Sequence, residues 1–173
     1  MGDRPISHRT FIIGVMGGHD SDPEAMNEAL QLGEEIAKQG YMVLTGGGPG
    51  AMKAASEGAH RAGGLVIGIL PNDRKRPLAG YPNEFVDIPI YTGMSDARNA
   101  INAKTPHVLI ALKGGAGTLS EIALAIKAGT PVICLHSPGF THPVARDVIV
   151  VNTVEEVMDA MDKILGNRKG SRS

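Results

Sequence analysis

Short apolar runs alternate with longer amphipathic segments along most of the chain. The runs lie near residues 11–16, 41–45, 65–70, 85–90, 107–112, 131–135 and 147–151. Between most of them, apolar residues recur at the spacing of a helix that buries one face. Strands that alternate with helices in this way are typical of a parallel sheet with crossover helices. We therefore expect an α/β fold: a single Rossmann-like, doubly wound, mainly parallel sheet with helices on both faces.

The first and last helices can be placed from the same pattern. The first is expected to begin at Asp22-Pro23, because proline is favoured at the first helical position, and to end at Gly40. Its predicted apolar face carries Met26, Leu30, Gly33 and Ala37. The last helix carries Val154, Val157, Met158, Met161 and Leu165 at the same period. We expect this last stripe to pack on the sheet or on a partner subunit.

The length of the chain fits one domain. All 173 residues are expected to form a single Rossmann-like domain around one core. The terminal segments 1–9 and 166–173 are predicted to be flexible tails. The basic loop 72–80 is either solvated or a lid that closes on a phosphorylated ligand.

A glycine-rich loop joins the apolar run 107–112 to the next helical pattern. Gly114, Gly115 and Gly117 precede or open that helix. Glycines remove the Cβ atoms that keep an anion away from the backbone, and the unpaired N–H groups at a helix start attract negative charge. The loop therefore predicts a ligand phosphate at the amides of residues 115–118, although glycine at such a turn can also serve tight geometry alone.

Two further loops have related features. The run 46–50 follows the expected strand 41–45, and Gly17-Gly18 follows the expected strand 11–16. In open α/β sheets, ligands bind outside the carboxyl ends of the strands, where these loops should meet. The three loops together predict an extended ligand.

Two charged residues near these loops, Glu121 and Arg98, admit two interpretations each. Thr118 and Glu121 have the spacing of a capping box, in which Glu121 would bond the amides of its own helix. The glycine run before Glu121 favours a functional role for it instead. Arg98 lies in the segment 92–102, which starts at the same sheet edge, and it could hold a phosphate through two hydrogen bonds. The less favoured alternative is an ion pair of Arg98 with Asp96 or Glu121.

Composition excludes several classes of function. The formal net charge is -1, and the scattered basic residues form no face for nucleic acid. The only cysteine, Cys134, is expected to be a buried thiol, and the six histidines form no metal-binding spacing. No run reaches the roughly 18 apolar residues that span a bilayer, and no signal peptide is visible. We expect a cytoplasmic protein with a small anionic ligand, no membrane or nucleic-acid partner, and no protein-bound metal.

The three glycine-rich segments 46–52, 63–71 and 114–121 together resemble the LOG family of lysine decarboxylase-like proteins. The resemblance implies a Rossmann-like domain that forms homo-oligomers, dimers or tetramers, with ligand sites near the subunit interface. In the enzymatic branch, an arginine and the glutamate of a P-G-G-x-G-T-x-x-E motif cleave the N-glycosidic bond of cytokinin nucleoside 5′-monophosphates. Arg98 and Glu121 match these two positions.

Two positions depart from the enzymatic pattern. Lys113 replaces the motif's proline, and Asn99 replaces the lysine that usually follows the arginine. The region around Arg98 is also shorter than in the enzymes. These departures are similar to the non-hydrolytic branch, the molybdenum cofactor carrier proteins, which bind a pterin that bears a phosphate monoester.

The resemblance thus favours a carrier or storage protein with molybdenum cofactor as carried ligand and molybdoenzymes as further partners. No catalytic residues are then expected; in the alternative, a phosphoribohydrolase, Arg98 and Glu121 would be catalytic. The expected ligand-binding residues are Gly17, Gly18, Gly47, Gly48, Met52, Met94, Arg98, Asn99, Lys113, Gly114, Gly115, Ala116, Gly117, Thr118 and Glu121. A dehydrogenase is a weaker reading, because no G-x-G-x-x-G follows the first strand.

Overall fold

The computed structural model describes residues 10–136 and 147–170. The predicted tails 1–9 and 171–173 lie outside the described residues. Residues 166–170, predicted to belong to the second tail, instead continue helix α5 (Val154–Gly170). Arg and Lys are good helix formers and are favoured near the C-terminal end of a helix dipole, so polar composition alone did not mark the helix end.

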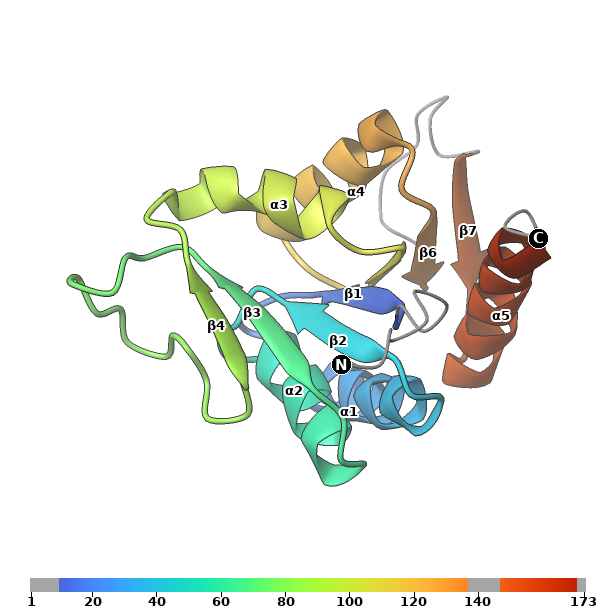
Figure 1. Cartoon of the computed structure of the whole chain (residues 1–173), viewed down its shortest axis with the longest axis horizontal. Coiled ribbons are helices and arrows are strands. Elements are labelled where there is room, and N and C mark those ends of the chain that lie inside the picture. The colour runs from blue at the N-terminus through green and yellow to red at the C-terminus, as the bar shows by residue number, and fades with distance from the viewer. Residues whose placement is uncertain (1–9, 137–146, 171–173) are drawn as a thin grey trace, which may run out of the picture.

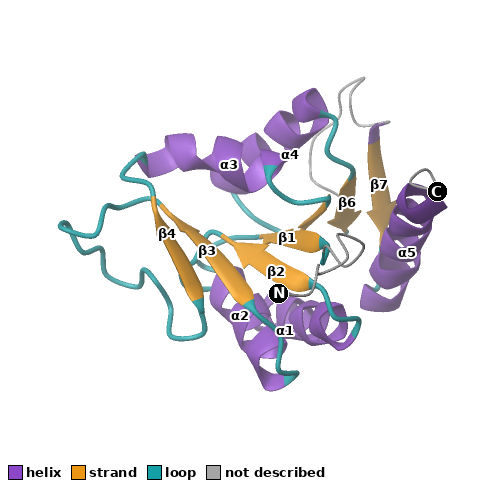
Figure 2. Cartoon of the chain, in the orientation of Figure 1, coloured by secondary structure: helices purple, strands orange, loops and turns teal. Residues whose placement is uncertain are grey.

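A seven-stranded sheet forms the centre of the described chain, and all of its strand pairs are parallel (Figures 1 and 2). The strands are β1 (Ile12–Met16), β2 (Met42–Thr45), β3 (Val66–Leu70), β4 (Ile88–Tyr91), β5 (Val108–Ala111), β6 (Val132–Leu135) and β7 (Val148–Val151). Their order across the sheet is β4-β3-β2-β1-β5-β6-β7. The predicted doubly wound, Rossmann-like fold is confirmed.

The chain reverses its direction of winding next to β1. Strands β2, β3 and β4 follow on one side of β1, whereas β5, β6 and β7 follow on the other. The loops that leave β1 and β5 therefore turn to opposite sides, and a crevice opens between them at the carboxyl ends of the strands. This crevice is where the fold places a ligand site.

Helices cover both faces of the sheet (Figure 1). One face packs against α1 (Pro23–Lys38), α2 (Ala51–Arg61) and α5, and the other packs against α3 (Asn99–Lys104) and α4 (Ala116–Ala128). A 3-10 helix, η2 (Ser95–Arg98), leads into α3. The stripe of α5 is buried against the sheet, since Val157, Met161 and Leu165 are at most 1% exposed.

Helix α1 has the predicted start, and its buried face includes Gly33 and Ala37, as predicted, but not Met26. Asp22 caps it by accepting a hydrogen bond from Ala25 N at 2.9 Å, and proline occupies the first turn. Met26, predicted to face the core, is 40% exposed. The buried face contains Ala25, Ala29, Leu32, Gly33, Ile36 and Ala37. Small residues are placed inward because a second helix packs closely there.

Glycines allow α1 and α2 to approach each other. A Cβ atom built at Gly33 would overlap the carbonyl oxygen of Ala55, and one built at Gly58 would overlap the carbonyl oxygen of Leu30. Both obstacles are backbone atoms, which cannot rotate away as a side chain would. The two helices that follow β1 and β2 are therefore held as one unit.

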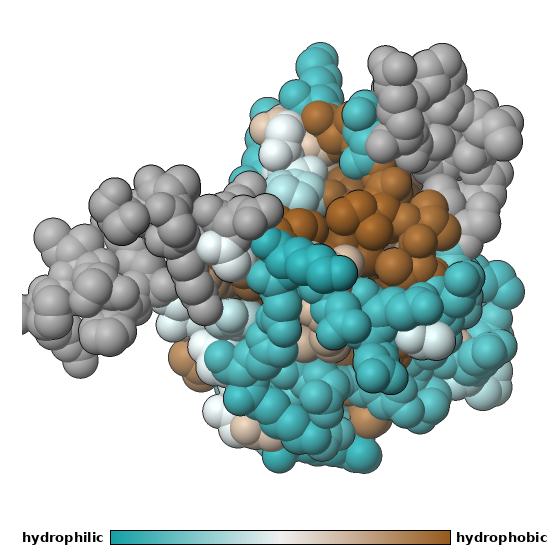
Figure 3. Space-filling view, turned by 90° about the vertical axis from the view of Figure 1, so that its right-hand side faces the viewer, coloured by the Kyte–Doolittle hydropathy of each residue, from teal (hydrophilic) through white to brown (hydrophobic). Residues whose placement is uncertain are grey.

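The edge strands expose apolar side chains. Ile88 and Ile90 on β4, and Ile149 and Val150 on β7, are 42% to 49% exposed. Figure 3 shows apolar side chains gathered on the side of the molecule that carries β7 and α5. The homo-oligomer predicted from the family resemblance stays a prediction, and these edges are surfaces that it could cover.

Replacing Gly33 with alanine should destabilise the fold. The added methyl group must displace the backbone of α2, and overpacking of this kind costs about 1–3 kcal/mol. Helix propensity alone would favour alanine by about 1 kcal/mol. We expect urea unfolding to show a lower midpoint for Gly33→Ala.

Gly166→Ala is the matched control, because Gly166 lies in α5 with open space around it. This variant should equal or exceed the wild type in stability. A Gly33→Ala protein as stable as Gly166→Ala would contradict the close packing of α1 on α2.

Candidate functional site

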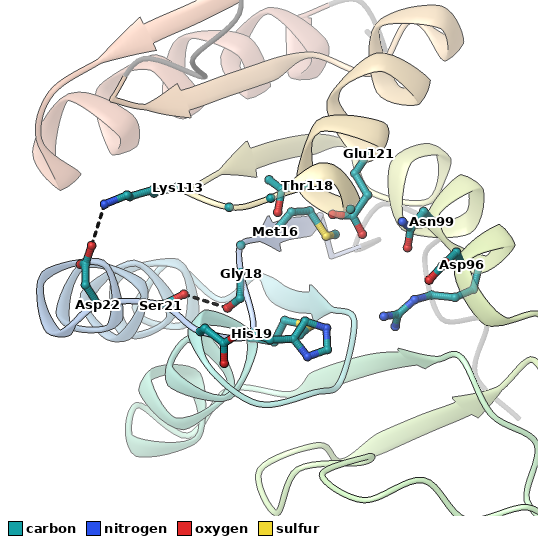
Figure 4. Close-up of a pocket in the computed structure, with 17 residues that line it drawn as sticks. Met16, Gly18, His19, Ser21, Asp22, Asp96, Asn99, Lys113, Thr118 and Glu121 are labelled. Carbon is teal, nitrogen blue, oxygen red and sulfur yellow. Dashed lines mark hydrogen bonds and ion pairs between the residues drawn. The ribbon is translucent and has the colours of Figure 1, made fainter.

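A cavity of about 640 Å³ opens at the carboxyl ends of β1 and β5, between the loops that leave them (Figure 4). It contains eleven of the predicted site residues: Gly17, Gly18, Met52, Arg98, Asn99, Lys113, Gly114, Gly115, Gly117, Thr118 and Glu121. Four others, Gly47, Gly48, Met94 and Ala116, do not line it. The structure thus brings together segments that are up to about one hundred residues apart in sequence.

The start of helix α4 forms one wall of this cavity. Gly115 is the N-cap residue and adopts an extended backbone. Within the described residues, the amides of residues 115–118 donate no hydrogen bond to the protein, and the first recorded bond of this turn comes from Leu119 N to Gly115 O at 3.1 Å. Unpaired amides at a helix N-terminus form a site for an anion.

Lys113 lies at one end of the cavity, where it pairs with Asp22 (Figure 4). The Nζ and Oδ2 atoms are 2.9 Å apart, and the two side chains are 76% and 43% exposed. The Asp22 carboxylate stabilises the charged form of Lys113 and so raises its pKa. The Ala25 amide and the Lys113 ammonium stabilise the charged form of Asp22 and so lower its pKa. An ion pair so open to water is weak, so Lys113 can move to another anion at little cost.

Glu121 is not part of a capping box, so that interpretation was wrong. Gly115 already caps α4, which places Thr118 inside the first turn and not before it. The Glu121 carboxylate instead lines the cavity and accepts a hydrogen bond from Asn102 Nδ2 at 2.8 Å. Burial raises the pKa of Glu121 to about 7, although the Asn102 bond and the Arg98 charge both lower it.

Arg98 forms neither of the ion pairs considered from sequence. The residue is 7% exposed, and its guanidinium donates from Nη1 to two strand-end carbonyls, those of Gly46, at 2.5 Å, and Ile69. Among the described salt bridges, none joins it to Asp96 or Glu121. Its Nε finds no hydrogen-bond partner in the described part of the chain, so one buried donor remains in a side chain that lines the cavity.

The glycines at 46–48 serve the packing of this protein's own side chains. A Cβ at Gly46 would meet Met52 and Arg98, and one at Gly48 would meet the ring of Tyr81. Gly47 has a φ of +75°, a conformation that favours glycine. These positions therefore matter for local geometry, and side chains of the protein itself occupy the space beside their backbone.

Several cavity residues were not predicted from sequence. The loop after β1 contributes His19, Asp20, Ser21 and Asp22, and the segment after β4 contributes Asp96. The hydroxyl of Tyr81 lies 2.9 Å from His19 Nε2, which ties the loop before β4 to the loop after β1. Residues 19–22 directly follow Gly17-Gly18 at the end of a strand, and this position could have identified them from sequence.

The remaining candidates of the sequence lie away from the cavity. Cys134 is buried in β6, as predicted, and burial raises the pKa of its thiol to about 11.

No cluster of three or more metal-ligating side chains occurs among the described residues. In the same part of the chain, no helix is long and apolar enough to span a bilayer. The loop 72–80 does not line the cavity.

Two solved structures resemble this chain over nearly its whole length. The molybdenum cofactor binding protein of Rippkaea orientalis is 39% identical with a TM-score of 0.82, and the match covers 92% of this chain and 99% of that one. The Moco carrier protein of Chlamydomonas reinhardtii is 40% identical with a TM-score of 0.79, at the same coverage of 92% and 99%. Both likenesses extend well beyond the fold alone.

An enzyme matches as well, over less of its own length. The cytokinin riboside 5′-monophosphate phosphoribohydrolase LOG of Oryza sativa subsp. japonica is 33% identical over 150 residues, which are 82% of this chain. The chain spans 61% of the length of that enzyme. A family model, the SLOG cluster4 family, matches residues 10–163. The chain therefore belongs to the SLOG cluster4 family, and its resemblance to the LOG proteins and their molybdenum cofactor carrier branch is confirmed.

Proposed function

We propose that this protein binds molybdenum cofactor, or its metal-free pterin, without consuming it, as a carrier or storage protein. The observation that carries the proposal is the cavity wall formed by unpaired amides of α4 beside Lys113, in a chain that matches a molybdenum cofactor binding protein over 99% of that protein. A volume of about 640 Å³ lies within the usual range for sites of small organic ligands.

The phosphate of such a ligand would bind at the amides of residues 115–118. Gly115, Gly117 and Thr118 line the cavity, and a Cβ built at Gly115 would meet no atom within 4 Å, so an anion can reach the backbone. Lys113 would add a mobile positive charge beside it, in exchange for its pairing with Asp22. Donors from the backbone and one lysine suit a phosphate monoester.

The pterin ring would lie toward the other end of the cavity, where Figure 4 shows Asp96, Asn99 and Glu121. A pterin presents adjacent ring N–H and amino donors, and carboxylate oxygens accept such donors well. The unpaired Nε of Arg98 offers a donor for a ring oxygen. These residues fit a polar, flat ligand that carries its negative charge at one end.

The alternative function, hydrolysis of a nucleoside 5′-monophosphate, is favoured by one observation. Glu121 lines the cavity with its carboxylate and is not occupied by capping. Another observation weighs against it. Arg98 Nη1 donates to strand-end carbonyls and is therefore not available to a substrate. The pKa of Glu121, about 7, does not separate the two functions, because a general acid or base with that pKa can act at neutral pH. A glycosidase needs a placed carboxylate and a positioned water.

Binding of the metal-free pterin should weaken when Lys113 is replaced by alanine. Loss of one partly exposed contact to a phosphate should raise the Kd about tenfold. Isothermal titration calorimetry measures this change directly. Lys38→Ala is a matched control, because Lys38 is also an exposed, ion-paired lysine but lies at the far end of α1. Equal affinities of the two variants would remove Lys113 from the site.

Release of ribose 5-phosphate from adenosine monophosphate or cytokinin monophosphates should be negligible. The measurement is turnover by the wild type compared with Glu121→Gln, which keeps the size of the side chain but removes the carboxylate. Pterin binding by the wild type, with no turnover by either protein, supports a carrier. Robust wild-type turnover that the variant abolishes would instead make the protein a phosphoribohydrolase.

The stability of the protein should fall between about pH 4.5 and pH 7 because of Glu121. Over this window the folded state keeps a proton that the unfolded chain releases, so the free energy of unfolding decreases by about 3 kcal/mol and then levels off. Urea unfolding at several pH values should show this decrease in the wild type and in Glu155→Gln, an exposed control. Glu121→Gln should lack it, and an unchanged decrease would show that Glu121 ionises normally.

A further inference from the structure

A second cavity, of about 590 Å³, adjoins the first. The two share the Asp22–Lys113 ion pair, Gly114, Gly115 and Thr118 as their common wall. The amides at the start of α4 therefore lie at a junction, with open space on both sides of the loop that carries them. A phosphate bound at these amides has room for a substituent in each direction.

The second cavity has a mixed lining that differs from the first. Glu24 and Glu28 of α1 contribute carboxylates, and Leu119 and Ile122 of α4 contribute an apolar surface. Leu119 is 44% exposed, which is high for a large apolar side chain. A flat base can lie against such an apolar surface, while carboxylates accept hydrogen bonds from ribose hydroxyls or amino groups.

We propose that the two cavities form one site for a two-armed ligand: a pterin in the first cavity joined through a diphosphate to a nucleoside in the second. This inference rests on the proposed function, which supplies the pterin arm. The preferred ligand is then a nucleotide-linked form of the pterin, and not the pterin that bears a phosphate monoester.

Charge determines where the diphosphate lies. Glu24 and Glu28 repel a phosphate from the second cavity, whereas the unpaired amides and Lys113 attract it to the junction. The second cavity therefore selects an uncharged arm with hydrogen-bond donors, as a nucleoside is, and rejects a chain that ends in further phosphates.

The ion pair at the junction provides the charge for the second phosphate group. Lys113 is 76% exposed and, among the described residues, forms its ion pair with Asp22, so its ammonium can turn to a ligand without leaving a buried charge. Asp22 keeps a partner when Lys113 leaves, because its other oxygen accepts from Ala25 N.

Glu28 is fixed in place at the rim of the second cavity. His136 Nε2 lies 2.8 Å from Glu28 Oε1, which leaves the other carboxylate oxygen for a ligand. The backbone N–H of His136 donates to Val151 O at 2.7 Å, and its φ of +69° is unusual for a residue other than glycine. The His136 ring is thereby anchored to β7, and it holds Glu28 toward the cavity.

Calorimetry with two ligands tests the inference: the metal-free pterin monophosphate, and the same pterin joined to guanosine through a diphosphate. We expect the wild type to bind the guanosine conjugate at least about tenfold more tightly. The double variant Leu119→Asn/Glu24→Gln, altered only in the second cavity, should lose this preference and keep its Kd for the monophosphate within about twofold.

The double variant Leu65→Asn/Glu57→Gln is the control, since Leu65 is also an exposed leucine and neither residue lines either cavity. It should keep the preference of the wild type. Equal wild-type affinity for the two ligands, or equal effects of the two double variants, would overturn the two-armed site while leaving the proposed function intact. Failure of both ligands to bind the wild type would overturn the proposed function and this inference together.

Discussion

The parallel pairing of β1 with β5 is the constraint on which the rest of the site depends. Residues 13–16 pair in register with residues 108–111, so the two strands end side by side at the same edge of the sheet. A hydrogen bond from Leu112 N to Met16 O, at 2.8 Å, continues the pairing one step further, and Gly18 N then reaches Lys113 O at 3.3 Å. Beyond that point the segments after β1 and β5 turn to opposite faces of the sheet. This divergence places the start of α1 and the start of α4 on either side of the cavity.

Burial, and not sequence spacing, decides what the two charged residues of the enzymatic motif do here. Arg98 satisfies carbonyl groups at the ends of β2 and β3 and so helps to hold three segments together. Glu121 is left with one amide partner in a poorly solvated place, which favours its neutral form. The chemistry of these two side chains thus depends on their surroundings, and their presence in the sequence does not by itself indicate hydrolysis.

Local patterns predicted the strands, the parallel sheet and the glycine loops, since each depends on residues close together in sequence. The same patterns failed where tertiary packing decides the outcome. The spacing of Thr118 and Glu121 fits a capping box, but a glycine three positions earlier than Thr118 caps the helix first. Met26 lies at core spacing, but the close approach of α2 selects the smaller residues of α1 for the interface. The ring of Tyr81 fills the space next to Gly48. Tyr81 lies in a loop more than thirty residues further along the chain, so the sequence around Gly48 could not predict this contact.

The position of Asp22 at the start of α1 has a consequence for the kinetics of ligand exchange. The carboxylate is stabilised at once by a helix amide and by Lys113. An incoming anion that takes Lys113 leaves Asp22 with the helix, and a departing anion returns Lys113 to a waiting partner. Asp22, Lys113 and the ligand anion thus each keep a counter-charge or a helix dipole throughout, so neither binding nor release requires an unpaired charge. Such an exchange would lower the barrier to release as well as the barrier to capture, as the proposed carrier function requires.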